Sequence, residues 1–380
     1  MKHTTRRRSA VMAGALSGLL ALTVAAAASA GAEDNVAYAK AKVAAAAPAI
    51  QSFKAPGPAL TNVKSLAGKT VYYIPATAVV PLFKAVGDSM TGALQSAGVK
   101  VQVCDGKSNP AAIADCFTQA ITAKAGAIVA GSIPAALAPN AFAAAAAAKI
   151  PIVNTLTVPA GPGDPKLVGY VTPNFIGFQQ TMADYVIANS NAAANVLVVE
   201  ITDTPATKIW VEQGALPEYK AHCPKCKVTT IKLSTSQFSK LPTLISTALI
   251  KDPNIKWIHS EADFAVQPIQ QGLQSSPRGS QVSVVSMDGT LPVLQLVKAG
   301  RVVKADMGYN LNAFGWYAAD QALRMMTGAS SIQMEQFPYT RLFQQANASR
   351  LNLTPAAQNT GEWYGSTDYQ AGFKKLWGVG

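Results

Sequence analysis

The feature that most constrains this chain is a repeated alternation of short β-branched segments with segments of helical length. The alternation begins at Lys69 and continues to Phe343. Strands that alternate with helices in this way predict parallel sheets with right-handed crossovers. A long helical segment that begins at Asn174 separates one set of elements from a second set of similar size. The sequence therefore predicts an α/β protein with two doubly wound, Rossmann-like parallel-sheet domains.

The predicted elements are assigned by residue range. In the first set we expect strands at 70–74, 100–104, 126–130, 151–153 and 167–171, and helices at 81–96, 111–123 and 140–148. After the helix at 174–191, we expect strands at 195–201, 227–233, 256–260 and 281–286, and helices at 208–221, 240–250, 266–274 and 291–298. A strand at 304–308, a helix at 314–326 and a strand at 339–343 remain. They are too short for a third domain, so we expect them to complete the two sheets.

The N-terminal residues predict export. Residues 1–8 carry basic side chains without an acid, and residues 9–30 form a nearly uncharged stretch that ends in Ala28-Ser29-Ala30. This order is typical of a signal peptide cleaved near Ala30. A permanent membrane helix is the alternative, because the stretch is just long enough to span a bilayer. Arg6-Arg7-Arg8 leaves the Sec and twin-arginine routes both open. No cysteine lies near the predicted cleavage site, so we expect a periplasmic, cell-surface or extracellular protein without a lipoprotein anchor.

Four cysteines are present, Cys104, Cys116, Cys223 and Cys226. An even number in an exported chain favours two disulfides. Cys104 at the end of a predicted strand and Cys116 within the next helix would join one β–α unit, which contributes about 3 kcal/mol by chain entropy. The motif His222-Cys223-Pro-Lys-Cys226 also admits a metal site or a redox pair, but it follows a helix and supplies at most three ligands. A plain disulfide is the favoured interpretation, and we predict no metal and no cofactor.

The composition favours neither catalysis nor nucleic-acid binding. His259 lies inside a predicted strand, where a satisfied core side chain is the favoured role, and His222 adjoins a cysteine. Only 14% of the residues are charged. Four of the positive charges that make up the net charge of +12 lie in residues 1–30, and the remaining excess of about +8 is spread along the chain without a block of lysine and arginine. We therefore predict that the protein is not an enzyme and binds no nucleic acid.

Polar side chains follow the predicted strands, at the edge where open α/β sheets bind ligands. Two aromatic residues lie at the beginning of the helices that follow two of these strands. Each polar residue could instead cap a helix, but capping does not explain the aromatic residues. We predict a cleft between the two domains that suits a neutral ligand with apolar faces and polar edges, such as a sugar or an aromatic ring. The predicted lining residues are Thr77, Phe83, Ser132, Asn154, Thr155, Asp203, Trp210, Asp263 and Asp288.

Several motifs occur in a characteristic order. The most specific is Val-Val-Ser-Met-Asp-Gly-Thr at 284–290, followed by Leu-Val-Lys-Ala-Gly-Arg-Val at 296–302. Supporting matches are Pro-Asn-Phe-Ile-Gly at 173–177 and Glu-Ala-Asp at 261–263. With these motifs, the segment from Lys69 to about Ala348 resembles the type I solute-binding proteins of ABC importers, in the ribose- and galactose-binding branch.

The resemblance implies a function and a hinge. The protein would be an exported substrate-binding protein that captures a small neutral, sugar-like solute by hinge closure. As a monomer, it would deliver this solute to an ABC permease and its ATPase. Asp288 would accept hydrogen bonds from ligand hydroxyls, and Phe83 would stack on the ligand. Three crossovers near Asn174, Tyr309 and Pro338 would form the hinge, and Asn174 and Tyr309 would complete the ligand site. The alternative is an extracellular sensor or receptor subunit of the same fold that binds a non-sugar small molecule.

The sequence departs from the family pattern at positions expected in the pocket. Val80-Pro81-Leu82-Phe83 stands where the family places Asn-Pro-Phe-Phe, and Asn154-Thr155 stands where an Asp-Arg pair is common. Pro173 and Ala262 likewise replace an acidic and a polar residue. Each change removes a polar partner, and an unpaired buried hydroxyl costs about 1–3 kcal/mol. A pentose or hexose ligand therefore does not follow, and a smaller or flatter, less polar ligand stays open.

The predicted domain boundaries combine the element pattern with this resemblance. Residues 1–30 form the signal peptide, and residues 31–65 form a flexible lead-in. Residues 66–173 with 310–337 form the N-terminal lobe, and residues 174–309 with 338–350 form the C-terminal lobe. Residues 351–380 form a tail whose aromatic side chains pack on a lobe.

Overall fold

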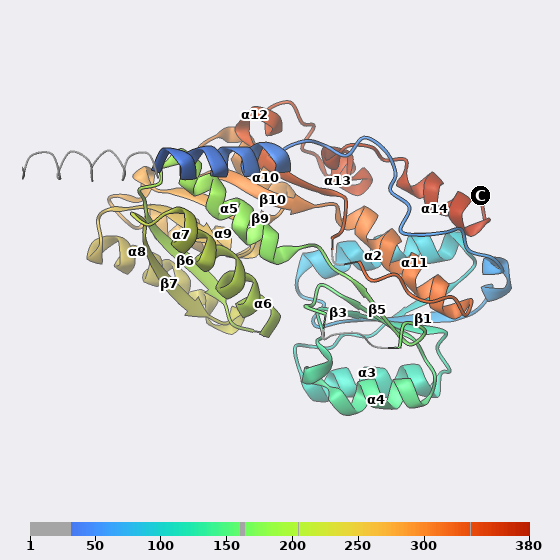
Figure 1. Cartoon of the computed structure of the whole chain (residues 1–380). Helices are drawn as coiled ribbons and strands as arrows, with labels where there is room; N and C mark the ends of the chain where they lie inside the picture. The colour runs from blue at the N-terminus through green and yellow to red at the C-terminus, as the bar shows by residue number, and fades with distance from the viewer. Residues whose placement is uncertain (1–31, 160–163, 204, 335) are drawn as a thin grey trace, which may run out of the picture.

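The computed structural model describes residues 32–159, 164–203, 205–334 and 336–380. The predicted signal peptide and its cleavage site lie outside the described residues. The alternation of strands and helices is confirmed, and the strands form two separate sheets, one in each lobe of the molecule (Figure 1). None of the helices described here is long and apolar enough to cross a membrane.

The N-terminal lobe is built on a five-stranded parallel sheet in the order β2-β1-β3-β4-β5. One face packs against α2 and α11, and the other packs against α3 and α4. Both faces are thus covered, as apolar parallel strands require. The strands are β1 (Thr70–Pro75), β2 (Lys100–Val103), β3 (Ala127–Gly131), β4 (Ile152–Thr155) and β5 (Val168–Val171). The helices are α2 (Pro81–Ser96), α3 (Pro110–Thr122), α4 (Pro139–Ala147) and α11 (Leu311–Met326).

The pair α2 and α11 joins segments that are far apart in the sequence. Gly315 allows the two helices to approach closely, because a Cβ atom at this position would lie 2.7 Å from the Met90 nitrogen. The Ser89 hydroxyl also donates a hydrogen bond to the Asn312 carbonyl oxygen at 2.6 Å. The late helix α11 therefore completes the first lobe.

The C-terminal lobe contains a six-stranded sheet in the order β11-β10-β9-β8-β6-β7. All neighbouring strands are parallel except β11, which pairs antiparallel with β10. Helices α5 and α7 cover one face, and α8, α9 and α10 cover the other. The strands are β6 (Asn195–Ile201), β7 (Lys227–Leu233), β8 (Ile255–Ser260), β9 (Ser283–Asp288), β10 (Val303–Tyr309) and β11 (Thr340–Gln344). The helices are α5 (Phe175–Asn189), α6 (Pro205–Trp210), α7 (Leu216–His222), α8 (Leu241–Lys251), α9 (Val266–Gln274) and α10 (Leu291–Ala299).

The helix expected at 208–221 is interrupted. A π-helical turn, Val211–Ala215, separates α6 from α7. Pro217 has no amide hydrogen to continue the helical ladder, so a register change just before it is favoured. Gly214 lies in the turn, and a Cβ atom there would be 2.7 Å from the Ile176 carbonyl oxygen.

The chain passes between the sheets at three places within these elements. It crosses from β5 to α5, from β10 to α11, and from α11 to β11. Two of these crossings leave from the carboxyl ends of strands, so the carboxyl edges of both sheets adjoin the connection between the lobes.

The segment expected to be a flexible lead-in is structured. Residues 32–46 form a helix, and Val36, Ala39 and Val43 lie on its apolar face against the core. The Tyr38 ring stacks on His222 with the ring centroids 3.9 Å apart. The sequence analysis missed this helix because abundant alanine and lysine obscure an apolar face of three- and four-residue spacing.

The C-terminal tail contacts both lobes. Its short helices are α12 (Gln345–Ala348) and α13 (Pro355–Thr360), and buried Trp363 and Tyr364 belong to the core of the C-terminal lobe. The final helix, α14 (Tyr369–Trp377), packs on α11, where Trp377 stacks on Trp316 with the centroids 5.5 Å apart.

Candidate ligand-binding site

The best-defined part of the site is the loop that follows β9. The Asp263 carboxylate accepts hydrogen bonds from the Ser286 hydroxyl at 2.7 Å, the Thr290 amide at 2.8 Å and the Thr290 hydroxyl at 2.7 Å. The Asp263 amide in turn donates to Asp288 at 3.3 Å. These contacts fix the turn Asp288-Gly289-Thr290 in a single arrangement, and Asp263 acts as a support beneath it.

Backbone strain is concentrated in the same turn. Asp288 has a φ of 133°, an unusual value for a residue with a side chain. Gly289 follows with a φ of 72°, and a Cβ atom there would lie 2.1 Å from the Tyr364 hydroxyl. A non-glycine residue held in this conformation at a sheet edge is typical of a functional position.

Burial raises the pKa values of the acids at this edge. Removal from water raises the pKa of Asp288 and of Asp306 well above the usual range, and neighbouring carboxylates raise both further. Burial also raises the pKa of Asp263, to about 6, although its hydrogen-bond donors oppose the increase. Burial thus favours the protonated form of both carboxyls, and a protonated carboxyl can donate as well as accept a hydrogen bond. Among the described residues, no group of three or more His, Cys, Asp or Glu could hold a metal ion.

Aromatic side chains gather beside the acidic turn. Trp210 lies 4.3 Å from Phe175 between ring centroids, and Tyr309 lies 5.5 Å from Phe175. The structure thus brings together Trp210 and Tyr309, both predicted from the sequence. It adds Phe175 and Phe178, which the sequence analysis missed, although their spacing of three residues at the start of a helix was visible.

A buried polar network lies on the strand next to β9. The His259 ring donates from Nε2 to the Gln179 side-chain oxygen at 2.8 Å, and its Nδ1 accepts from the Tyr219 hydroxyl at 3.2 Å. Burial lowers the pKa of His259 to about 3, so the ring is neutral. The predicted role of a satisfied core histidine is confirmed. Glu261, at the end of the same strand, accepts from the Ile201 amide at 2.6 Å, and burial raises its pKa well above the usual range.

Apart from Phe83, the predicted residues of the N-terminal lobe carry hydroxyls or an amide. Thr77 is partly buried, and its hydroxyl accepts from the Val79 amide at 3.4 Å. Ser132 has a left-handed backbone with a φ of 58°. Asn154 and Thr155 were expected after the fourth strand, but they are its last two residues and are buried. The Thr155 hydroxyl donates to a backbone carbonyl, whereas the side-chain oxygen of Asn154 has no partner.

Three predicted residues have clear structural roles. Phe83 is buried in the core, and its carbonyl oxygen accepts from the Tyr73 hydroxyl at 3.0 Å. Asn174 caps α5 by accepting from the Gly177 amide at 2.9 Å. Asp203 is exposed and accepts from the amide and the hydroxyl of Thr235 at 2.8 and 2.6 Å. The structure does not bring these three together with the Asp288 turn through any direct contact described here.

A pocket of about 210 Å³ lies between the lobes next to this turn. Its walls come from α2, from Gly289, from the crossover at 309–312 and from the tail near Trp363. Of the residues predicted from the sequence, only Tyr309 lines it. The contribution of the tail was not predicted.

Both cysteine pairs form disulfides, which confirms the favoured interpretation. Cys104 is bonded to Cys116, with the Cα atoms 5.7 Å apart, and Cys223 is bonded to Cys226, with the Cα atoms 5.2 Å apart. The second disulfide follows the carboxyl end of α7. It therefore lacks the helix N-terminus that stabilises a reactive thiolate.

Two doubly wound lobes joined by three crossovers, with polar and aromatic side chains at the adjoining strand ends, define the class of two-lobed ligand-binding proteins. The periplasmic binding protein domain family matches residues 71–330, so the chain belongs to this family. No match is found among curated proteins.

Solved structures support the same fold. A 5-methylthioribose transporter solute-binding protein from Thermotoga lettingae has a TM-score of 0.68 at 14% identity, covering 80% of this chain and 96% of its own. A solute-binding protein from Agrobacterium vitis with bound allitol has a TM-score of 0.66 at 18% identity, covering 75% and 98%. An ABC sugar transporter subunit from Rhodobacter sphaeroides has a TM-score of 0.65 at 18% identity, covering 74% and 99%.

Proposed function

We propose that this protein is the exported substrate-binding protein of an ABC importer and that it captures a small, neutral, hydroxyl-bearing solute. Membership of the periplasmic binding protein domain family supports binding and export. Similar structures are described with allitol or 5-methylthioribose, which supports a polyol or a sugar derivative as the solute class.

The observation that carries the proposal is the Asp288 turn. Its backbone is strained, its position is fixed by Asp263, and burial raises the pKa of its carboxyl well above the usual range, which favours the protonated form. A neutral carboxyl can donate one hydrogen bond and accept others, which suits a hydroxyl that also does both. Trp210 and Tyr309 would lie against the apolar face of the ligand. Thr77, Ser132, Asn154 and Thr155 would supply the partners from the other lobe.

Ligand capture then proceeds by hinge closure without chemistry. The solute enters between the lobes, contacts both strand edges and stabilises the closed form by its higher affinity for that form. A membrane permease and its ATPase would receive the solute from the closed protein. No residue of the site is proposed to react.

The experiment is a thermal-shift screen of the chain from residue 31 onward against polyols, sugars, nucleosides, amino acids and aromatic acids. A ligand at 100 times its dissociation constant should stabilise the protein by about 2.7 kcal/mol. Asp288→Ala should abolish the shift, Asp288→Asn should retain part of it because the amide still donates and accepts, and Asp115→Asn on the exposed face of α3 should not change it. A shift that survives Asp288→Ala would place the ligand elsewhere, and no shift with any compound would contradict the proposed function.

A further inference from the structure

The segments that precede and follow the family domain run side by side between the lobes. Ile50 pairs with Gly365 in a parallel bridge: the Ile50 amide donates to the Tyr364 carbonyl at 2.9 Å, and the Ser366 amide donates to the Ile50 carbonyl at 2.9 Å. Figure 1 shows the blue N-terminal segment passing with the red C-terminal segment from one lobe to the other. Both segments lie outside residues 71–330, which match the family.

On the C-terminal lobe this pair is held by β11 and by the core. Arg341 on β11 donates from Nε to the Ala47 carbonyl at 3.0 Å and from Nη1 to the Trp363 carbonyl at 2.6 Å, so one guanidinium holds both segments. Trp363 and Tyr364 are 1% and 3% exposed within the core of this lobe. This end of the pair therefore moves with the C-terminal lobe.

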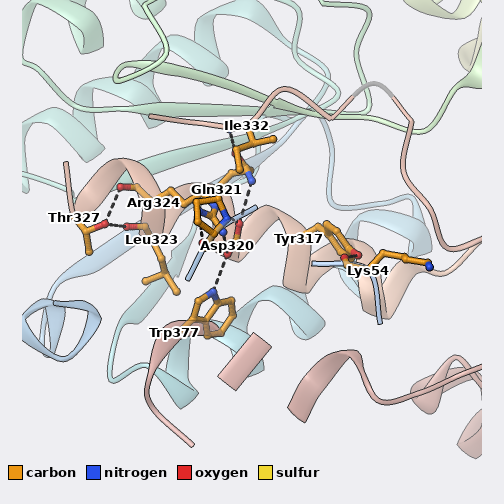
Figure 2. Close-up of polar contacts among 10 residues, drawn as sticks. Lys54, Tyr317, Asp320, Gln321, Leu323, Arg324, Thr327, Ile332 and Trp377 are labelled. Carbon is orange, nitrogen blue, oxygen red and sulfur yellow. Dashed lines mark hydrogen bonds and ion pairs between the residues drawn. The ribbon is translucent and has the colours of Figure 1, made fainter. Parts of the chain in front are cut away.

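On the N-terminal lobe the same pair is held by α11. Figure 2 shows Asp320 of α11 between Arg324 and Trp377, whose indole Nε1 donates to Asp320 at 2.8 Å. Arg324 forms a buried ion pair with Asp320 at 2.6 Å and donates to the Pro58 carbonyl at 2.9 Å. The Tyr317 hydroxyl donates to the Lys54 carbonyl. One buried network on one helix thus holds both terminal segments.

Little chain separates the two sets of anchors. Ile50 belongs to the C-terminal lobe through the bridge, and Phe53 packs on Phe373 of α14 with ring centroids 4.8 Å apart. Three residue steps span at most about 10 Å when extended. On the other segment, five steps lead from Tyr364 to buried Tyr369, which is at most about 17 Å. The tail just before this pair also contacts the hinge, because Asn310 and Asn312 of the second crossover donate to the Gly361 and Gln358 carbonyls at 3.3 and 2.5 Å.

We infer that residues 47–53 and 363–369 form a strap that limits how far the two lobes can separate. Two lobes joined only by three crossovers can separate until the crossovers themselves are extended. Two short terminal segments that are bonded to each other and anchored in both lobes would stop this separation earlier. The strap acts on the same closure as the proposed function, and it keeps the ligand-free protein closer to the closed form. A protein with more of its population in the competent form binds its ligand more tightly.

The test measures lobe separation without ligand, so its result does not depend on finding the solute. Spin labels are placed at the exposed positions Ala147 on α4 and Ile250 on α8. Double electron–electron resonance then measures the distance between the two lobes. Gly-Ser-Gly-Ser is inserted between Gln51 and Ser52 and again between Thr367 and Asp368, where the side chains are exposed. The matched control carries the same two insertions in exposed turns of one lobe, after Pro253 and after Pro277.

The strap insertions should lengthen the mean distance and broaden its distribution, and the control should match the wild-type protein. Identical distributions for the wild-type and strap variants would overturn the inference. If the double insertion does not fold, Tyr317→Phe with Trp377→Phe removes two anchor hydrogen bonds while leaving an aromatic ring at each position. This pair should broaden the distribution to a smaller extent, and an unchanged distribution would again overturn the inference. A longer distance in the strap variant, together with no stabilising compound in the thermal-shift screen, would support the strap and contradict the proposed function.

Discussion

The two lobes share one architecture but present different chemistry at their adjoining strand edges. Among the predicted ligand residues, every acid comes from the C-terminal lobe, and the polar residues of the N-terminal lobe carry hydroxyls or an amide. Asp263 and Asp288 are held in a buried hydrogen-bond network, whereas Thr77 is partly exposed and the Asn154 side-chain oxygen has no partner. In the proposed site, the C-terminal lobe would offer a preformed half, and the N-terminal lobe would complete its contacts when a ligand binds.

Asp263 and Asp203 are a buried and an exposed version of the same support. Asp263 and Asp203 each accept from the amide and the hydroxyl of one threonine at similar distances. Asp263→Ala should lower the free energy of unfolding by about 3 kcal/mol, because it leaves buried donors without a partner. Asp203→Ala should cost less than about 1 kcal/mol, because water replaces the exposed carboxylate. Denaturant unfolding measures both values, and equal losses would contradict a preformed edge in the C-terminal lobe.

The disulfides allow a second comparison, since each lobe contains one. Cys104 and Cys116 are separated by 12 positions, and Cys223 and Cys226 by 3. Replacing the first pair with serine should cost about 3 kcal/mol and replacing the second about 2 kcal/mol, because the longer loop loses more entropy on closure. Thermal unfolding of the two double variants gives the order. A larger loss for the second pair would show that its position next to the N-terminal helix matters more than loop length.

Much of the fold could be predicted from the sequence, because alternating periodicity is a local property. The strand at 70–74 and the helix at 81–96 are found within a residue of their predicted ends. The π-helical turn at 211–215 could not be predicted from periodicity, because it depends on Pro217 and on the contact of Gly214 with α5. The helix at 32–46 was missed because alanine and lysine obscure its apolar face in the sequence. Its packing against the lobe, including the stacking of Tyr38 on His222, is a tertiary contact that the local sequence does not reveal.

The candidate site was predictable only in part. Asp263, Asp288, Trp210 and Tyr309 gather at one edge because strand ends of a parallel sheet meet there. Their division into support and contact residues was not predictable, since it depends on which donors surround each carboxylate. The tail residues that line the pocket were not predictable either. They lie about 50 positions after the second crossover in the sequence, and only the folded structure brings them to the pocket.

The N-terminal segment is held on the two lobes by electrostatically different contacts. On the N-terminal lobe, the buried Asp320 carboxylate is paired with Arg324. On the C-terminal lobe, the helix at 32–46 covers Asp184, whose pKa is raised to about 8 by burial, then by the charge of Glu218 and by a hydrogen bond with it, while Lys42 opposes the increase. His222 lies 3.6 Å from Glu218, and Tyr38 adds a hydrogen bond to the same carboxyl. Asp320 thus has a cation as its partner, whereas Asp184 has an acidic neighbour and favours its protonated form.

A proton held in the folded state gives stability a defined pH dependence. Asp184 is protonated in the folded protein below about pH 8 and ionised in the unfolded chain above about pH 4, so folding takes up a proton between these values. The contribution of Asp184 to stability is therefore complete below about pH 4 and decreases until about pH 8. Asp184→Asn cannot ionise and should flatten this decline, so its unfolding midpoint relative to the wild-type protein should rise from pH 5 to pH 8. Asp115→Asn, on the exposed face of α3, should follow the wild-type curve. If the unfolding midpoints of Asp184→Asn and the wild-type protein changed with pH in parallel, Asp184 would be ionised in the folded protein. The contrast between Asp184 and Asp320 would then disappear.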